Sequence, residues 1–297
     1  KRMTKKLLAL GLSLTMALGL AACGSGTSSS ASGSSSNTDG STSQAESSAS
    51  TGDTSTPSVD KLVLGTSADY PPFEFHVLDE NGEDQIVGID VFLGEQIAKD
   101  MGVEFEVVHM DFNNLFTLLN QGQCDMVIAA AEIDEEGVRP ASSDYSDGYY
   151  SDIPPKIVVK AGTEDQYSSL EDFSGKIVGA QTSTTKETIV KNYMTGAELV
   201  SMSSVIDLVN NLVYDKVDAL VLDGAVADEY LASNPDLAAV DIDMSDYVEP
   251  YRVWVAKGDP ENLLPSINET IAKVLEDGTM DSFIARANEL SAQALES

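Results

Sequence analysis

Positive charge is the scarcest property of this chain of 297 residues. It has 17 Lys and Arg against 49 Asp and Glu, which gives a formal net charge of −32 at pH 7. Because nucleic-acid binding depends on basic patches that neutralise phosphates, this imbalance excludes nucleic acid as a partner. The same acidity disfavours direct docking on anionic lipid headgroups.

Cysteine and histidine are nearly absent. Cys23 lies in the N-terminal segment, so Cys124 is the only thiol in the rest of the chain and no internal disulfide is expected there. A lone cysteine of this kind is more often a small buried residue than a nucleophile. His76 and His109 are expected to be structural. Since no nucleophile–base pair, zinc spacing or phosphate loop occurs, the sequence predicts no metal and no cofactor.

The N-terminus has the pattern of a secretory signal. Basic residues precede an apolar run at 7–22, which is shorter than the roughly 20 residues of a membrane-spanning helix, so residues 1–22 are predicted to be a signal peptide. The run ends in LAAC, which resembles a bacterial lipobox with Cys23 as the lipidated residue; a chance cysteine after an ordinary signal peptide is the alternative. Residues 23–58 are mostly Ser, Thr, Gly and Ala, a composition that predicts a flexible lipidated linker.

Two stretches organise the remaining chain. The apolar run 126–131 predicts one buried strand, and it opens into Glu132 and later Arg139. The run 217–222 does the same and ends at Asp223. Buried strands that end in polar loop residues build binding crevices at the carboxyl ends of α/β sheets. Two such ends with opposite charges predict a crevice between two lobes that holds a zwitterion.

The elements around these stretches repeat one order. Each half reads strand, site loop, helix, strand, helix, Asp, strand and site residue, which predicts an α/β protein with two similar lobes. In the first half, Asp90 is predicted to cap a helix that ends at Met101. The acidic segment at 79–90 is predicted to begin with a hairpin turn at its Asn-Gly, with a calcium loop as the weaker alternative.

Seven motifs resemble those of one protein family. They are YPPFEF (70–75), VGID (87–90), MDFNNL (110–115), DYSDGYY (144–150), GKIVGAQTSTT (175–185), VDALVLD (217–223) and YRVWVAKGDP (251–260). Together they resemble the extracellular solute-binding proteins of the polar amino-acid type, which feed ABC importers. The resemblance implies a type II periplasmic-binding-protein (Venus-flytrap) fold with two crossover strands, near 151–155 and 249–251. It places lobe 1 at 59–152 plus 251–297 and lobe 2 at 153–250.

The resemblance also implies roles for three residues of lobe 1. Tyr70 and Phe112 would enclose the ligand side chain, with ordinary core packing as the alternative. Arg139 would pair with the ligand carboxylate through a bidentate fork, a geometry that lysine cannot provide. A surface arginine is the alternative.

Four residues of lobe 2 would complete the site. Thr184 and Thr185 stand where a helix begins, so they would complete the carboxylate site with N–H groups and hydroxyls. Asp223 would take the ligand ammonium, with a plain helix cap as the alternative. Gln181 would touch the ligand side chain.

This sequence departs from the family pattern at three places. Ser67 stands where the family usually has an acid, and Ala130 to Glu132 replace a Gly-x-Ser/Thr pattern. The loop before Arg139 carries an apparent insertion of two residues. Glu132 is hypothesised to replace the missing acid or to meet a cationic ligand side chain; a solvated loop acid is the alternative. Ser67, Ala130 and Glu132 are therefore predicted to line the site.

The expected function is binding rather than catalysis. A monomeric lipoprotein on the extracellular face of the cell membrane, in a Gram-positive bacterium, would capture an amino acid and deliver it to an ABC permease complex. The alternative is a periplasmic dehydratase of prephenate-like substrates on the same fold, with Glu132 as its general acid. A lipid-anchored sensor that signals to a partner protein also remains open.

Overall fold

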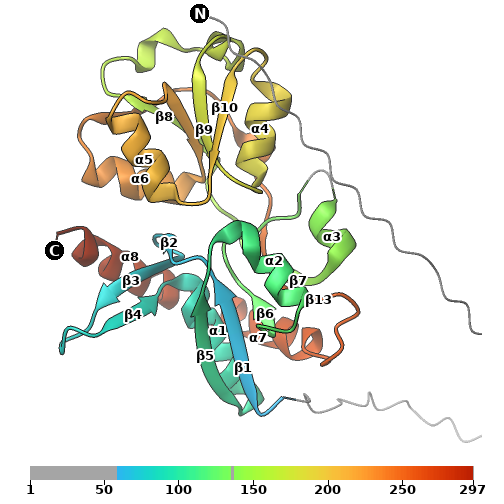
Figure 1. The fold of residues 1–297 in the computed structure, drawn as a ribbon. Helices are drawn as coiled ribbons and strands as arrows, with labels where there is room; N and C mark the ends of the chain where they lie inside the picture. The colour runs from blue at the N-terminus through green and yellow to red at the C-terminus, as the bar shows by residue number, and fades with distance from the viewer. Residues whose placement is uncertain (1–58, 135–136, 297) are drawn as a thin grey trace, which may run out of the picture. The chain divides into compact units, whose positions relative to one another are not determined.

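The computed structural model describes residues 59–134 and 137–296 of the chain. The predicted signal peptide at 1–22 and the predicted linker at 23–58, with Cys23, lie outside the described residues. Within the described ranges, no helix is both long and apolar enough to cross a membrane. The architecture is shown in Figure 1.

Two five-stranded sheets form the framework. The first has the order β5-β1-β6-β13-β7 and the second the order β10-β9-β11-β8-β12. The first sheet consists of β1 (Lys61–Thr66), β5 (Glu104–His109), β6 (Met126–Val127), β7 (Ser143–Tyr150) and β13 (Tyr251–Ala256). The second consists of β8 (Lys156–Lys160), β9 (Ile177–Gln181), β10 (Glu198–Met202), β11 (Ala219–Leu222) and β12 (Leu237–Ala239).

The two sheets have the same pattern of strand directions. Strand β1 pairs in parallel with β5 and β6, as β9 does with β10 and β11. In the first sheet, β13 is antiparallel to both of its neighbours, β6 and β7. In the second sheet, β8 is antiparallel to both of its neighbours, β11 and β12. The predicted two-lobed α/β fold is confirmed. We call the first sheet with its helices lobe 1 and the second lobe 2.

Helices cover the two sheets, as Figure 1 shows. Lobe 1 carries α1 (Ile89–Met101), α2 (Phe112–Asn120), α3 (Val138–Ser142), α7 (Leu264–Glu276) and α8 (Thr279–Glu296). Lobe 2 carries α4 (Thr185–Tyr193), α5 (Val205–Val213) and α6 (Gly224–Ser233), with the short turns η1 (Glu164–Gln166), η2 (Leu170–Phe173) and η3 (Ser245–Tyr247). Helix α5 buries Val205, Leu208, Val209 and Leu212, the spacing of one apolar helix face.

The chain crosses between the lobes twice. It leaves lobe 1 after β7 and enters lobe 2 at β8, through residues 151–155. It returns at β13, after residues 248–250, and the final helices α7 and α8 pack against α1 of lobe 1. We propose on this basis that the lobes divide as 59–152 plus 251–297 and 153–250.

An aspartate secures the same position in each lobe. Asp125, just before β6, accepts a hydrogen bond of 2.7 Å from the backbone N–H of Val63. Asp218, just before β11, accepts one of 2.8 Å from the N–H of Ile177. Each carboxylate therefore ties the central strand to the neighbouring one, so that the polar ends of β6 and β11 lie at the carboxyl edges of their sheets.

Two local predictions in lobe 1 were wrong, for connected reasons. Asp90 does not cap α1: the N-cap position belongs to Gly88, and Asp90 lies in the first turn of the helix. Its carboxylate instead accepts from the backbone N–H of Ala130 at 2.7 Å and from the hydroxyl of Tyr149 at 2.8 Å. Ala130 has φ 46, a left-handed conformation outside the regular β region. The predicted strand at 126–131 therefore ends at Val127.

The turn predicted at 79–82 is confirmed. It joins β3 (Glu74–Leu78) to β4 (Asp84–Val87) in a small sheet that β2 (Asp69–Tyr70) completes. Asp79 accepts from the backbone N–H groups of Asn81 and Glu83, each at 2.8 Å, which leaves this acid committed to the turn. The part of the chain that the structure describes contains no cluster of three or more metal-ligating side chains.

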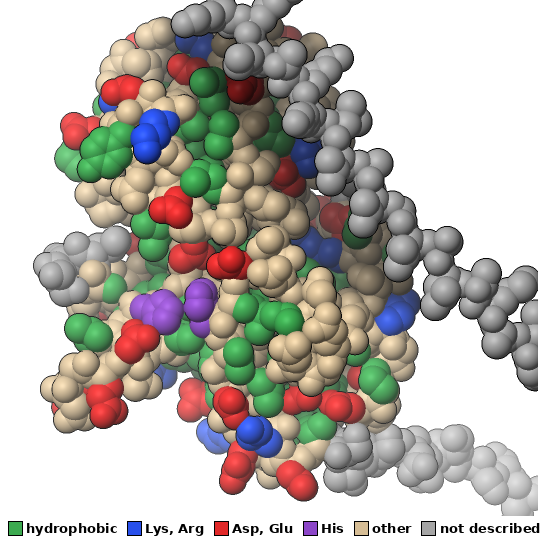
Figure 2. All heavy atoms as spheres, in the orientation of Figure 1, with side chains coloured by type: hydrophobic (Ala, Val, Ile, Leu, Met, Phe, Trp, Pro, Cys, Tyr) green, Lys and Arg blue, Asp and Glu red, His purple; other side chains and the backbone are tan. Residues whose placement is uncertain are grey.

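Acidic side chains are spread over both lobes on the face drawn in Figure 2, with fewer basic ones between them. The net charge of −32 is therefore distributed rather than gathered in one patch on this face. Six acidic or basic residues of the described ranges are instead buried inside the protein: Glu74, Asp90, Glu132, Arg139, Lys186 and Asp223.

Candidate ligand-binding site

A buried cavity lies between the loops of the two lobes. Its wall comes from the loop after β1, α2, the segment after β6 and α3 in lobe 1, and from the segment after β9, the start of α4 and the end of β11 in lobe 2. Its lining includes every site residue predicted for the described part of the chain: Ser67, Tyr70, Phe112, Ala130, Glu132, Arg139, Gln181, Thr184, Thr185 and Asp223. Glu74, Ala129, Ala131 and Lys186 also line it and were not predicted.

The protein's own side chains fill this cavity. Its free volume is about 10 Å³, which is close to the minimum for a single water molecule. A molecule of amino-acid size therefore enters only when the two lobes separate.

Arg139 provides the positive end of the cavity. Its guanidinium lies 5.3 Å from the ring centroid of Phe112 and 5.2 Å from that of Phe116, within cation–π range. It donates at 2.5 Å to the backbone oxygen of Glu132 and at 2.5 Å to that of Ser183 in lobe 2. The side chain is buried, so the alternative of a surface arginine is wrong despite the insertion before it.

Asp223 provides the negative end. It occupies the N-cap position of α6, but its side chain makes no capping hydrogen bond, so the plain helix-cap alternative is wrong. The carboxylate points into the cavity, where it accepts from the hydroxyl of Tyr70 and forms an ion pair with Lys186. Asp223 is 4 % exposed. A carboxylate from lobe 2 thus faces aromatic and basic groups in the same buried space.

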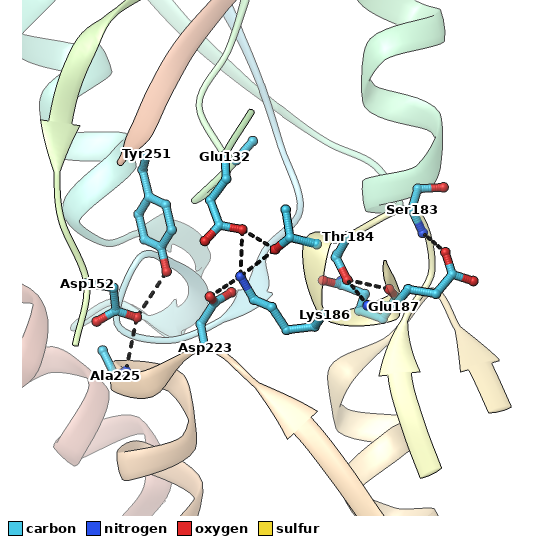
Figure 3. Close-up of polar contacts among 12 residues, drawn as sticks. Glu132, Asp152, Ser183, Thr184, Lys186, Glu187, Asp223, Ala225 and Tyr251 are labelled. Carbon is cyan, nitrogen blue, oxygen red and sulfur yellow. Dashed lines mark hydrogen bonds and ion pairs between the residues drawn. The ribbon is translucent and has the colours of Figure 1, made fainter. Parts of the chain in front are cut away.

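Lys186 was missed by the sequence analysis. Its ammonium lies 2.7 Å from Oε2 of Glu132 and also pairs with Asp223 (Figure 3). Burial lowers the pKa of Lys186, but the two carboxylates outweigh this effect and the pKa is raised from its ordinary value. Lys186 is therefore protonated at neutral pH. The sequence held one signal: a lysine in the first turn of a helix opposes the helix dipole and needs compensation.

Glu132 faces the cavity rather than solvent. It is 5 % exposed. Its Oε2 accepts from the hydroxyl of Thr185, and it also accepts from the ammonium of Lys186 (Figure 3). The alternative of a solvated loop acid is wrong. Burial raises the pKa of Glu132, Lys186 counteracts this effect, and Asp223 adds to it.

The start of α4 and the end of β9 form the lobe 2 wall. Thr184 is the N-cap: its hydroxyl accepts from the N–H of Glu187 at 3.3 Å and donates to the oxygen of Gln181 at 2.6 Å. The Gln181 amide donates to the oxygen of Ser203 at 3.0 Å. The loop predicted to precede a helix is therefore an ordered helix start that faces the cavity.

Ser67 and Ala130 line the lobe 1 wall with their polar groups engaged. The Ser67 hydroxyl donates to Asp69 at 3.3 Å, and the Ala130 N–H donates to Asp90. Neither residue brings a charge to the cavity, so Ser67 does not supply the acid that the resemblance leads one to expect there.

Glu74 lies beside Asp90 under the cavity and was also missed. It is 1 % exposed, and its Oε2 has no hydrogen-bond partner in the described structure. Burial, reinforced by the neighbouring Asp90, raises the pKa of Glu74 well above its usual range, and burial raises the pKa of Asp90 to about 6. This burial favours the neutral form of the Glu74 carboxyl. Its signal in the sequence was an acid between two aromatic residues, Phe73 and Phe75.

Solved structures with this arrangement of lobes are numerous among amino-acid-binding proteins. The amino acid ABC transporter substrate-binding protein AbpA of Streptococcus pneumoniae, bound to L-arginine, is similar with a TM-score of 0.73 and 32 % identity, over 78 % of this chain and 96 % of that one. An ancestral arginine-binding protein bound to arginine has a TM-score of 0.68 and 36 % identity, over 77 % and 98 %.

The sequence comparisons agree. The arginine-binding extracellular protein ArtP of Bacillus subtilis is 33 % identical over 223 residues, 74 % of this chain and 83 % of ArtP. The L-cystine-binding protein TcyJ of Escherichia coli is 27 % identical, over 74 % of this chain and 80 % of TcyJ. The family model of bacterial extracellular solute-binding proteins, family 3, matches residues 62–287. The chain therefore belongs to family 3 of the bacterial extracellular solute-binding proteins.

Proposed function

We propose that this protein binds a free α-amino acid between Arg139 and Asp223 and delivers it to an ABC importer. The observation that carries this proposal is the approach of a buried guanidinium from lobe 1 and a buried carboxylate from lobe 2 to one cavity. An α-amino acid has the complementary pair of charges on neighbouring atoms. The amino-acid-binding functions in the names of the relatives support the same solute class.

The ligand would replace contacts that the protein makes with itself. Its carboxylate would take the place of the Ser183 oxygen at Arg139, next to the helix start at Thr184 and Thr185. Its ammonium would take the place of Lys186 at Asp223. Micromolar affinity requires about 8 kcal/mol, which is within reach of two desolvated charge pairs together with aromatic packing.

The ligand side chain would lie toward the remaining lining residues. Tyr70 and Phe112 would flank it, and Gln181 and Ser67 would offer an amide and a hydroxyl. Closing the lobes about the crossover segments would bury the ligand, and opening them would release it. No observation favours the dehydratase alternative, because the acid that it would need, Glu132, is ion-paired with Lys186.

A thermal-shift screen of the purified protein against the twenty common amino acids tests this function. An amino acid present at 100 times its Kd should add about 2.7 kcal/mol to the free energy of unfolding. For a domain of this size, that corresponds to a rise in Tm of about 5–10 °C. If none of the amino acids raises Tm at millimolar concentration, the proposal is wrong.

We also propose that the protein is a monomeric lipoprotein held at the extracellular face of a Gram-positive cell membrane through Cys23. Acyl chains on this residue would provide the two or more lipid groups that stable anchoring requires. Replacing Cys23 by alanine should move the protein from the membrane fraction to the medium when the full chain is expressed in such a host. Retention of this variant in the membrane fraction would contradict the anchor, and light scattering of the released protein checks the monomer.

A further inference from the structure

Lys186 occupies an unusual position for a lysine. Its side chain is 4 % exposed, although lysine is rarely buried without a partner. It also lies in the first turn of α4, where the partial positive charge of the helix dipole repels a cation. Two unfavourable terms thus act on one ammonium group, and the groups around it must offset both.

The ammonium group has three acceptors in the cavity. They are Oε2 of Glu132 at 2.7 Å, Oδ1 of Asp223, and the hydroxyl oxygen of Thr185 at 3.0 Å. A lysine ammonium has three N–H donors, so this environment satisfies it. Glu132 belongs to lobe 1 and Asp223 to lobe 2, and Figure 3 shows the ammonium between them. Lys186 therefore already pairs with both acids that could receive a cationic ligand side chain.

The charges that line the cavity balance. Arg139 and Lys186 are positive, Glu132 and Asp223 are negative, and burial of Glu74 favours its neutral form. When an α-amino acid binds as proposed, its carboxylate pairs with Arg139 and its ammonium with Asp223, and Lys186 keeps Glu132. These are matched pairs, and no charge of either sign is left for the ligand side chain.

We propose that Lys186 makes this site selective for amino acids with an uncharged side chain. The inference rests on the proposed function, because it assigns the substrate class of the same cavity. It separates this chain from the relatives whose names specify arginine. A cationic side chain would be buried close to the Lys186 ammonium, and a like charge at about 5 Å in a protein interior weakens binding by roughly 100-fold. An anionic side chain would be buried close to the Glu132 carboxylate, which repels it, and no unpaired cation would be left to offset this repulsion.

Titration calorimetry of the full chain with neutral and charged ligands of matched shape tests this inference. The pairs are L-citrulline with L-arginine, L-norleucine with L-lysine, and L-glutamine with L-glutamate, and the twenty common amino acids complete the series. For each pair with measurable binding to the wild-type protein, the neutral ligand should have an affinity at least about tenfold higher than that of the charged ligand. In Lys186→Gln, the ratio of citrulline to arginine affinity should shift toward arginine by roughly 100-fold, since Glu132 is then unpaired.

Lys191→Gln is the matched control. Lys191 lies on the same helix, is half exposed and pairs with Glu187 outside the cavity, so this variant should keep the wild-type ratios. If Lys186→Gln does not fold, Lys186→Met also removes the charge and leaves Glu132 unpaired, and its ratio should move toward arginine as well.

The outcomes separate the two proposals. A wild-type protein that binds arginine, lysine, aspartate or glutamate most tightly overturns the selectivity and leaves the amino-acid site intact. An unchanged ratio in Lys186→Gln, or in Lys186→Met where that variant is used, also overturns it. Tightest binding of an uncharged amino acid, with the ratio shifted in the variant, supports it. If no amino acid binds either protein, the proposed function itself fails.

Discussion

Replacing Arg139 by alanine should weaken binding of the tightest amino-acid ligand by about 2–5 kcal/mol, or roughly 30-fold to several thousand-fold. The ligand carboxylate would then be buried without its partner, since the cavity offers no other group of fixed positive charge on that side. The rings of Phe112 and Phe116 would also lose the cation that lies over them. Calorimetric titration measures the loss directly.

Two further variants test whether the loss comes from the position and the planar shape of the Arg139 side chain. Arg139→Lys keeps the charge but loses the planar fork, so its affinity should fall between those of wild type and alanine. Arg252→Ala is the matched control, because Arg252 also stacks on an aromatic ring and donates to a backbone oxygen, yet it does not line the cavity. Undiminished affinity in Arg139→Ala, or an equal loss in Arg252→Ala, would contradict the assignment of the carboxylate site.

Replacing Gly88 by alanine should strongly destabilise the folded protein. Gly88 has φ 136, a backbone conformation that costs an L-residue about 1–3 kcal/mol. A Cβ there would lie 2.0 Å from the backbone oxygen of Phe73 and 2.9 Å from the nitrogen of Glu74, so two chain segments would have to move apart. Overpacking of this kind adds about 1–3 kcal/mol. We expect a total loss of about 3–5 kcal/mol in the free energy of unfolding, measured by chemical denaturation.

Gly102→Ala separates the clash from the backbone strain. Gly102 ends the same helix with φ 73, and an added Cβ there would meet no atom within 4 Å. This variant should therefore cost only the left-handed strain, about 1–2 kcal/mol. Equal losses in the two variants would show that the approach of Phe73 to Gly88 does not constrain the fold.

The parts of the site that depend on local chemistry could be predicted from the sequence. A buried strand that ends in a charge reveals itself within a few residues, as at 217–222 followed by Asp223. Arg139 could be placed despite the insertion before it, because the residues that become β7 follow it closely. The order of strands and helices repeats in both halves, so the two-lobed α/β class could be predicted from the pattern, although the strand order within each sheet could not.

The parts that depend on distant partners could not be predicted. Lys186 is separated from Glu132 by 54 positions, and nothing near either residue shows that they meet. Ala130 belongs to an apolar run that reads as a continuous strand, but its backbone is turned by Asp90, 40 positions earlier. In both cases a buried charged group contacts a partner that is distant in sequence and is brought close only by folding.

The direct contacts across the cavity have a thermodynamic consequence for ligand capture. Tyr70 contacts Asp223, Thr185 contacts Glu132 and Arg139 contacts Ser183 across the cavity. A solute must displace these internal substitutes, so the measured affinity equals the intrinsic affinity multiplied by the fraction of molecules that are open. Weakening such a bridge could therefore strengthen capture, so the concentration range over which the protein loads depends on the stability of the closed form as well as on the contacts of the solute.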